Sequence, residues 1–270
     1  MNKRIEQSQK NGYTGTSLKA KIISRQNIAG THVTLGDPAI CEMISYLGFD
    51  FIWVDTEHSP LDLGPLKLHL MAAKSGDTPV IVRVPWNDPV MIKRVIDMGP
   101  AGVVIPMVNT AEEAQKAVDA CHYPPNGNRG WGPYGAIRYG LDDKLKWIHE
   151  TSKDLCLFAQ VEHVEAVRNL REIADVDGID GFVIGPCDLS GSVGELYKMY
   201  EPTTVAVIDE AIAILKEKGK YIAVSCGNSP DVLEFWHSRG VHMISAGMDY
   251  SFILSGAGET LKNIRNAQTK

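Results

Sequence analysis

Residues 51–58 of the chain read FIWVDTEH, a short apolar run that ends at three ionisable side chains. Four apolar residues are too few for a typical helix, and aromatic and β-branched side chains favour a strand. The arrangement recurs, because other short apolar runs also end at polar residues, glycine or proline. The pattern predicts eight strands, at residues 28–35, 51–54, 80–84, 103–108, 155–161, 181–184, 221–224 and 243–246.

Helical patterns lie between most of these runs, and several stop at a glycine, which commonly ends a helix. Strands that alternate with helices predict parallel βαβ units, and eight of them favour a closed (β/α)8 barrel over an open doubly wound sheet. A dinucleotide-binding domain is disfavoured, since no Gly-x-Gly-x-x-Gly follows the first strand. The helices are expected at residues 38–47, 63–74, 89–98, 111–121, 165–174, 205–218, 231–238 and 253–267.

The chain has 270 residues and a formal net charge of −6, and 44% of its residues are hydrophobic. Because one α/β barrel holds about 250 residues, we expect a single barrel at residues 27–270 with a helical N-terminal extension at residues 1–26. The acidic balance argues against nucleic acid or an anionic membrane as a partner. The cysteines form no C-x-x-C pair, and the sequence shows neither a signal peptide nor a membrane span, so we expect a cytoplasmic protein.

Ionisable side chains gather at the ends of the predicted strands. In a (β/α)8 barrel the carboxyl ends of the strands meet at one rim, where active sites lie. Burying charged groups there costs free energy unless they pair or bind a ligand, so we expect a site. The residues concerned are Asp55, Glu57 and His58 after the second strand, Arg83 at the third, Gln160 and Glu162 at the fifth, and Asp188 after the sixth.

Two of these carboxylates suggest a metal site. Gln160 and Glu162 face the same side of a strand, and Glu162 and Asp188 follow neighbouring strands, within reach of one cation. Two carboxylates with water and ligand oxygens suit Mg²⁺ or Mn²⁺ better than a closed zinc site. The alternative is a strand-end salt bridge, or an Asp188 that caps a helix.

His58 and Arg83 are the candidates for proton transfer and charge stabilisation. A histidine beside carboxylates can act as a general base, although a structural histidine is the alternative. Arg83, within an apolar run, could bind a carboxylate or an oxyanion, or else pair with Asp55 or Glu57. Since no lysine ends a strand, Schiff-base chemistry is disfavoured and metal-assisted chemistry is favoured.

Together these segments resemble the HpcH/HpaI family of class II, pyruvate-specific aldolases. The resemblance covers the chain from about residue 30 to about residue 258, and it implies a barrel of the phosphoenolpyruvate/pyruvate superfamily. It also implies a divalent metal ion (Mg²⁺, Mn²⁺ or Co²⁺), a 2-oxo acid and an aldehyde as substrates, and a homo-hexamer built from trimers. The matching motifs are VDTEH at 54–58, VRVP at 82–85, PMVNT at 106–110, YPP at 123–125, RG at 129–130, QVE at 160–162 and GPCDLS at 185–190.

The family's roles transfer to individual residues of this chain. Glu162 and Asp188 match the metal ligands, and His58 matches the catalytic base, with Asp55 close by. Asp97 resembles an aspartate that works with the histidine across a subunit interface. The resemblance assigns substrate binding to Arg83, Gln160, Gly185, Pro186 and Cys187.

The chain departs from the family pattern at three places. The family usually has Gly-x-Trp on the first strand, where this chain has Gly30-Thr31-His32. Position 187 is usually alanine or asparagine but is Cys187 here, and the family's loop arginine has no clear match, with Arg138 displaced from it. All three affect the pocket for the aldehyde rather than the metal.

The resemblance therefore predicts an aldolase that cleaves 4-hydroxy-2-oxo acids to pyruvate and an aldehyde through a pyruvate enolate. An oxaloacetate decarboxylase, or an enolate-adding enzyme like macrophomate synthase, is the alternative within the same chemistry. Outside this chemistry, the residues also allow a barrel that binds an oxo acid without turnover, or a phosphate-handling barrel that uses the glycines near Gly247 and Gly256.

Overall fold

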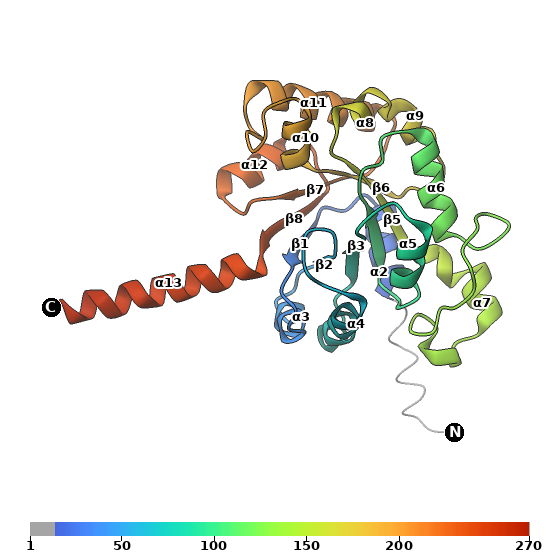
Figure 1. Ribbon diagram of the computed structural model, residues 1–270, viewed down its shortest axis with the longest axis horizontal. Helices are drawn as coiled ribbons and strands as arrows, with labels where there is room; N and C mark the ends of the chain where they lie inside the picture. Colours follow the sequence, from blue (N-terminus) through green and yellow to red (C-terminus); the bar gives the residue numbers. More distant parts are fainter. Residues whose placement is uncertain (1–13, 270) are drawn as a thin grey trace.

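Eight parallel strands form a closed barrel within residues 14–269, the part of the chain that the computed structural model describes (Figure 1). The strands follow one another in chain order, and the last pairs with the first. The expected closed (β/α)8 barrel is therefore confirmed. The strands are β1 (Ile28–Val33), β2 (Phe51–Asp55), β3 (Val80–Arg83), β4 (Gly102–Ile105), β5 (Cys156–Val161), β6 (Gly181–Ile184), β7 (Ile222–Cys226) and β8 (Met243–Met248).

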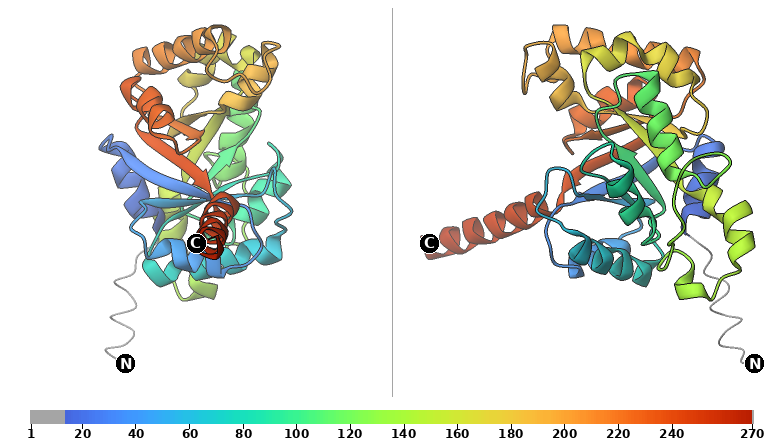
Figure 2. Two further views of the ribbon diagram at one scale, coloured as in Figure 1. Left: turned by 90° about the vertical axis from the view of Figure 1, so that its left-hand side faces the viewer. Right: turned by 45° about the vertical axis from the view of Figure 1, so that its right-hand side comes forward.

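Helices surround the barrel (Figures 1 and 2). Within residues 14–269, none of them is long and apolar enough to cross a membrane. The α-helices are α2 (Thr14–Ile23), α3 (Ala39–Ser45), α4 (Leu63–Ala72), α5 (Pro89–Ile96), α6 (Ala111–Cys121), α7 (Lys144–His149), α8 (Val164–Arg168), α9 (Leu170–Asp175), α10 (Pro186–Ser192), α11 (Pro202–Glu217), α12 (Pro230–Ser238) and α13 (Asp249–Gln268). Short 3₁₀ turns are η1 (Ala73–Gly76), η2 (Arg138–Gly140) and η3 (Thr151–Asp154).

The helices differ from the expected ones in four places. The segment expected as one helix at 165–174 is two short helices, α8 and α9, that meet at Asn169. The short helices α7 and α10 were not expected. α10 follows Gly185 and starts at Pro186, a pair that is typical of a loop, and α7 has only six residues. α13 begins at Asp249, before the expected start at residue 253.

Inward-facing side chains change from apolar to polar along the strands. On β2, Phe51 and Trp53 face the barrel interior, while Ile52 and Val54 pack against the helices. This alternation is the period of a strand, and it makes Asp55 the next inward position. β3 and β5 follow the same pattern, so their polar ends converge at the carboxyl end of the barrel.

α2 covers the amino-terminal end of the barrel. Its Leu18 and Ile22 are buried in the same cluster as the inward-facing side chains, and Lys19 pairs with Asp180 at 2.6 Å. Part of the N-terminal extension expected at residues 1–26 lies outside the described residues. The division into extension and barrel therefore stays a prediction.

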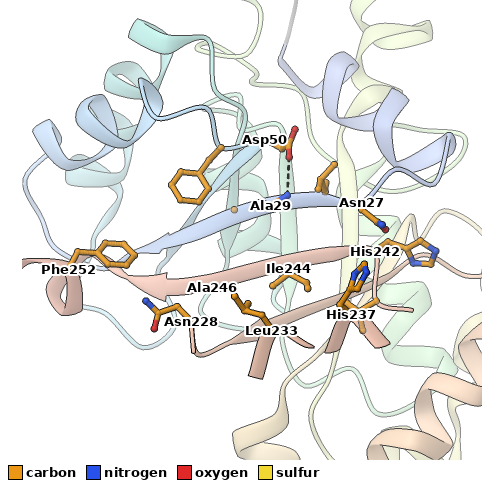
Figure 3. A pocket seen from close by; sticks show the side chains of 14 residues that line it. Asn27, Ala29, Asp50, Asn228, Leu233, His237, His242, Ile244, Ala246 and Phe252 are labelled. Atoms are coloured by element: carbon orange, nitrogen blue, oxygen red, sulfur yellow. Dashed lines mark hydrogen bonds between the residues drawn. The ribbon is translucent and has the colours of Figure 1, made fainter. Parts of the chain in front are cut away.

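α13 projects away from the barrel (Figures 1 and 2). Its first residue, Asp249, is buried and accepts hydrogen bonds from the backbone N–H groups of Thr34 and Leu35, both at 2.8 Å. These bonds tie the start of the helix to the end of β1. In a (β/α)8 barrel each strand's helix belongs to the outer ring. Because α13 instead projects away, a groove of about 560 Å³ beside β1 and β8 is not covered by it (Figure 3).

Candidate active site

Arg83 ends β3 inside the barrel and lies between two acids. Its Nε and Nη2 contact the carboxylate oxygens of Asp55 at 3.0 and 2.5 Å, and its Nη1 lies 2.8 Å from Glu57. These contacts offset the cost of burying a cation, and they are the ion pair that the sequence left open as an alternative. A guanidinium has five N–H groups; within residues 14–269 two of them donate hydrogen bonds to Asp55, and Nη1 forms an ion pair with Glu57 Oε2, which accepts no hydrogen bond. With one further N–H assigned to that ion pair, two remain for an oxygen of a substrate.

Glu162 lies just beyond β5 and is held in place from two sides. Its Oε1 accepts a hydrogen bond from the backbone N–H of Met107 at 2.7 Å, and its Oε2 accepts one from the amide of Gln160. Met107 has a φ of 52°, a strained conformation for a residue with a side chain. A Cβ at Gly185 would lie 2.8 Å from the Cβ of Glu162, so only glycine allows β6 to approach this closely.

Asp188 lies in the first turn of α10, which begins directly after β6. The residue at the helix cap is Gly185, so the structure does not support the alternative that Asp188 caps the helix. Pro186 is buried, whereas Cys187 is half-buried and Asp188 is exposed. Burial, and then the charge of Asp188, raise the pKa of the Cys187 thiol, which argues against a thiolate nucleophile.

The ring of His58 is open to solvent at the same rim. Its side chain is 64% exposed, and Nε2 lies 3.9 Å from the Glu57 carboxylate. Asp55 accepts a hydrogen bond from the backbone N–H of His58 at 3.4 Å, while its carboxylate is occupied by Arg83. Within residues 14–269 the acid beside the imidazole is therefore Glu57, whereas Asp55 accepts a hydrogen bond from the backbone of His58 and does not contact its ring.

Negative charge is in excess at this rim. Burial raises the pKa of Glu57 to about 7, with Asp55 and Asp188 adding to the rise and Arg83 opposing it. Burial likewise raises the pKa of Glu162 to about 7, and the hydrogen bond from the Met107 N–H opposes this rise. One guanidinium does not balance these carboxylates, so the site favours a further cation.

The donor set fits a hydrated divalent cation. Within the described part of the chain, no three His, Cys, Asp or Glu side chains gather closely enough to hold a metal by themselves. Glu162 and Asp188 provide two carboxylates, and Mg²⁺ is commonly held by one or two carboxylates with water and substrate oxygens. The buried Oε1 of Gln160 has no hydrogen-bond partner within residues 14–269. It is therefore available to a bound water or substrate.

Asp97 lies apart from the other predicted residues. It follows α5, which runs from the carboxyl end of β3 to the amino end of β4, so it lies at the opposite end of the barrel from His58. Its carboxylate accepts a hydrogen bond from Arg129 at 2.8 Å. A role across a subunit interface stays a prediction. Arg138, the displaced candidate for the family's loop arginine, pairs with Asp142.

One group of inward-facing polar residues was missed or only partly identified from the sequence. His32 on β1 was identified as a departure from the family, but Ser225 on β7 and Ser245 on β8 were not. Both serines contact the imidazole of His32, at 3.0 and 3.1 Å. The signal that could have identified the two serines is their register, because both lie at inward-facing positions of β7 and β8. The backbone of Met107 was also missed, because a residue name does not reveal a bond made by its backbone.

Known proteins are similar to this chain in both sequence and fold. The model of the family described as HpcH/HpaI aldolase/citrate lyase matches residues 29–255. A 4-hydroxy-2-oxo-heptane-1,7-dioate aldolase of Klebsiella pneumoniae is 35% identical over 216 residues, which are 80% of this chain and 81% of the relative. The Escherichia coli enzyme of the same name is 32% identical over 245 residues, 91% of this chain and 93% of the relative.

Solved structures agree with this assignment. An HpcH/HpaI aldolase from Desulfitobacterium hafniense superposes with a TM-score of 0.84 at 26% identity, covering 92% of this chain and 96% of the other. Macrophomate synthase superposes with a TM-score of 0.80 at 26% identity, covering 94% and 90%. The match of the family model, the identity of the relatives and the shared barrel place this chain in the HpcH/HpaI aldolase/citrate lyase family, as an enzyme of the lyase (aldolase) type.

Proposed function

We propose that the chain is a class II, divalent-metal-dependent aldolase, an aldehyde-lyase that cleaves 4-hydroxy-2-oxo acids to pyruvate and an aldehyde. One observation carries the proposal: Arg83 keeps two N–H groups free beside a cluster of buried carboxylates that fits a cation. This combination suits a substrate that carries adjacent carboxylate and ketone oxygens. The relatives named as aldolases support the same class of reaction.

The residues of the rim divide the chemistry between them. A divalent cation (Mg²⁺, Mn²⁺ or Co²⁺) held by Glu162 and Asp188 would polarise the 2-oxo acid as a Lewis acid. The free N–H groups of Arg83 donate to the ketone oxygen, where negative charge grows as the enolate forms. Asp55 and Glu57 keep the guanidinium in position, so the donors are oriented before the substrate arrives.

Proton transfer falls to His58. Cleavage removes the proton of the 4-hydroxyl and breaks the C3–C4 bond, and the electron pair of that bond passes to C3 to form the enolate. The aldehyde leaves, and C3 then takes up a proton to give pyruvate. His58 is exposed at the rim, and Glu57 beside its Nε2 can orient the ring.

Deuterium exchange at C3 of pyruvate tests the proposal, because it reports enolate formation without an aldehyde. We expect exchange in D₂O that EDTA abolishes and that Mg²⁺, Mn²⁺ or Co²⁺ restores. Glu162→Gln should remove both exchange and cation binding measured by calorimetry. The matched control Glu234→Gln, on the exposed side of α12, should keep both. Exchange that persists without metal contradicts the mechanism.

Oxaloacetate decarboxylation is the second candidate function. Loss of carbon dioxide forms the same enolate and needs no aldehyde pocket, which is where His32 and Cys187 depart from the family. The similarity to macrophomate synthase also favours enolate chemistry with another acceptor. Rates of pyruvate release from oxaloacetate and from 4-hydroxy-2-oxo acids, compared at equal metal concentration, identify the main activity. A barrel that only binds oxo acids would show no exchange and no release.

We also propose that the chain assembles as a homo-hexamer, a dimer of trimers, with α13 exchanged between copies. α13 exposes apolar side chains at Ile253, Leu254, Leu261 and Ile264, which are 48–69% exposed. The groove beside β1 and β8 is lined by apolar residues such as Leu233, Ile244 and Phe252 (Figure 3). Helices in proteins gain most of their stability from the packing of an apolar face, and within residues 14–269 α13 has no such packing on its own barrel. The α13 of a second copy would supply an apolar surface to cover the groove.

Light scattering tests this assembly. The full chain should scatter as a hexamer, and a chain that ends after Met248 should lose that state. Ile253→Asp with Leu254→Asp, on the apolar face of the helix, should weaken the assembly, whereas Asn266→Asp, on the opposite face, should not. A full-length chain that stays monomeric at micromolar concentration contradicts the proposal.

A further inference from the structure

A neutral polar layer closes the side of the barrel opposite Arg83. On β7, Ile222 and Val224 pack outward against the helices, so Ser225 faces the barrel axis. Ser245 on β8 pairs in register with Ser225, and both hydroxyls contact His32 on β1. None of these three residues has a part in the enolate chemistry described above.

The contacts of His32 determine where its proton lies. Nδ1 is 3.1 Å from Ser245 Oγ, which can donate or accept a hydrogen bond, and 3.3 Å from the carbonyl oxygen of Gly247, which can only accept one. We assign the proton to Nδ1, because this tautomer satisfies the carbonyl and lets the Ser245 hydroxyl accept. The ring is 3% exposed, and burial and the charge of Arg83 lower its pKa to about 4, against the opposing effects of Asp55, the Gly247 carbonyl and Asp249. The imidazole is therefore neutral at physiological pH, and its Nε2 has a lone pair and no proton.

This state of the imidazole fixes the hydroxyl of Ser225. Ser225 Oγ lies 3.0 Å from Nε2, and since Nε2 can only accept, the hydroxyl donates its single proton to it. The oxygen of Ser225 is left with lone pairs alone. The serine is half-buried, and the pairing of Ile184 with Val224 places Ser225 beside Gly185, next to Glu162. Its oxygen is thus a hydrogen-bond acceptor at the edge of the candidate site.

We propose that Ser225, oriented by His32, selects the aldehyde portion of the substrate, accepting a hydrogen bond from a hydroxyl group and disfavouring a carboxylate there. A carboxylate would place its own lone pairs against those of Ser225 Oγ. The inference rests on the proposed aldolase function and specifies its substrate class: 4-hydroxy-2-oxo acids whose aldehyde portion carries a further hydroxyl. It separates this chain from relatives named for a dioate, whose aldehyde portion ends in a carboxylate.

Aldol addition of pyruvate to matched aldehydes tests the proposal on the full-length, metal-loaded enzyme. Glycolaldehyde and propanal differ only by a hydroxyl in place of a methyl group, as do 3-hydroxypropanal and butanal. Succinic semialdehyde supplies the carboxylate. One neutral hydrogen bond predicts a roughly three- to tenfold higher kcat/KM for the hydroxylated member of at least one pair. Succinic semialdehyde should be the poorest acceptor.

Three variants identify the source of the preference. Ser225→Ala should bring the ratio of the two kcat/KM values within each pair to about one. It should also raise kcat/KM for succinic semialdehyde relative to that for butanal. Ser225→Thr, which retains a hydroxyl, should keep the preference. Ser229→Ala, on the exposed residue before α12, is the matched control and should keep the wild-type ratios.

Each result has a definite meaning. Equal ratios in the wild type, or ratios that Ser225→Ala leaves unchanged, overturn this inference. Because C3 exchange of pyruvate is measured without an aldehyde, its absence overturns the proposed function and this inference together. Exchange without a hydroxyl preference overturns this inference alone.

Discussion

Replacing Arg83 with alanine would leave two buried carboxylates without their partner. The side chains of Asp55 and Glu57 are 6% and 12% exposed, and Arg83 contacts the first twice and the second once. Removing one member of a buried ion pair costs about 3–5 kcal/mol. At roughly 2–4 °C per kcal/mol for a large domain, the melting temperature should fall by roughly 6–20 °C.

The pH dependence of this loss identifies its cause. Burial by itself raises the pKa of Asp55, but the hydrogen bonds and charge of Arg83 hold it below its usual range. A carboxyl group with a depressed pKa stabilises the fold above its ordinary pKa, and this contribution is lost as the pH falls through the depressed value. Without Arg83, burial dominates and the pKa of Asp55 rises. Protonation then relieves the buried charge, so the difference from the wild type should shrink between pH 8 and pH 5.

Scanning calorimetry at a fixed subunit concentration measures both effects. A triple variant with Arg83→Met, Asp55→Asn and Glu57→Gln should recover much of the loss, because no buried charge is left unpaired. The surface pair of Arg171 and Glu217 provides the control, and Arg171→Ala should change the melting temperature little. A small, pH-independent decrease for Arg83→Ala would refute the reasoning, since it would mean that the pair contributes no more than a surface contact.

Three further predictions concern packing and the metal site. Gly30→Ala should lower stability in urea by about 1–3 kcal/mol, because its Cβ would lie 2.3 Å from the Phe51 ring, whereas Gly64→Ala, with open space around it, should not. Gly185→Ala should displace Glu162 and reduce C3 exchange, with an unchanged circular dichroism spectrum. Cation affinity should weaken as the pH falls from 8 to 6. The raised pKa of Glu162 means that its carboxyl group must lose a proton before it binds the cation. Calorimetry in two buffers of different ionisation enthalpy measures how many protons are released on binding.

The barrel itself could be predicted from the sequence, because each strand has a short apolar run and a polar stop. The direction of α13 could not be predicted. Its apolar residues recur at helical spacing whether the helix packs on its own barrel or leaves it, so the periodicity carries no information about the partner. The short helix α10 was missed for a different reason. Seven residues that begin at Pro186, directly after Gly185, have too little periodicity to distinguish a helix from a loop.

The candidate site shows the same limit. Arg83, Glu162 and Asp188 could be predicted, because an ionisable residue at the end of an apolar run is conspicuous. The sequence offered a pairing of Arg83 with Asp55 or Glu57 only as an alternative to ligand binding, and the structure shows that Arg83 contacts both acids. The acid beside the His58 ring could not be predicted: Asp55 is close to His58 in the chain, but its carboxylate binds Arg83. Ser225 was missed because a serine in a strand is common, and only its inward register and its contact with His32 give it significance.

The arrangement of the rim separates two tasks. The charged groups that would form the enolate come from β2, β3, β5 and the turn after β6, whereas the neutral layer of His32, Ser225 and Ser245 comes from β1, β7 and β8. Trp53 lies between them, its ring centroid 5.0 Å from that of His32 and 5.9 Å from the Arg83 guanidinium. Since Arg83 is held by acids of the β2 segment, substitutions on β7 and β8 leave its contacts intact. Under the proposed function, the choice of aldehyde could therefore change on one side of the barrel while enolate formation is preserved on the other.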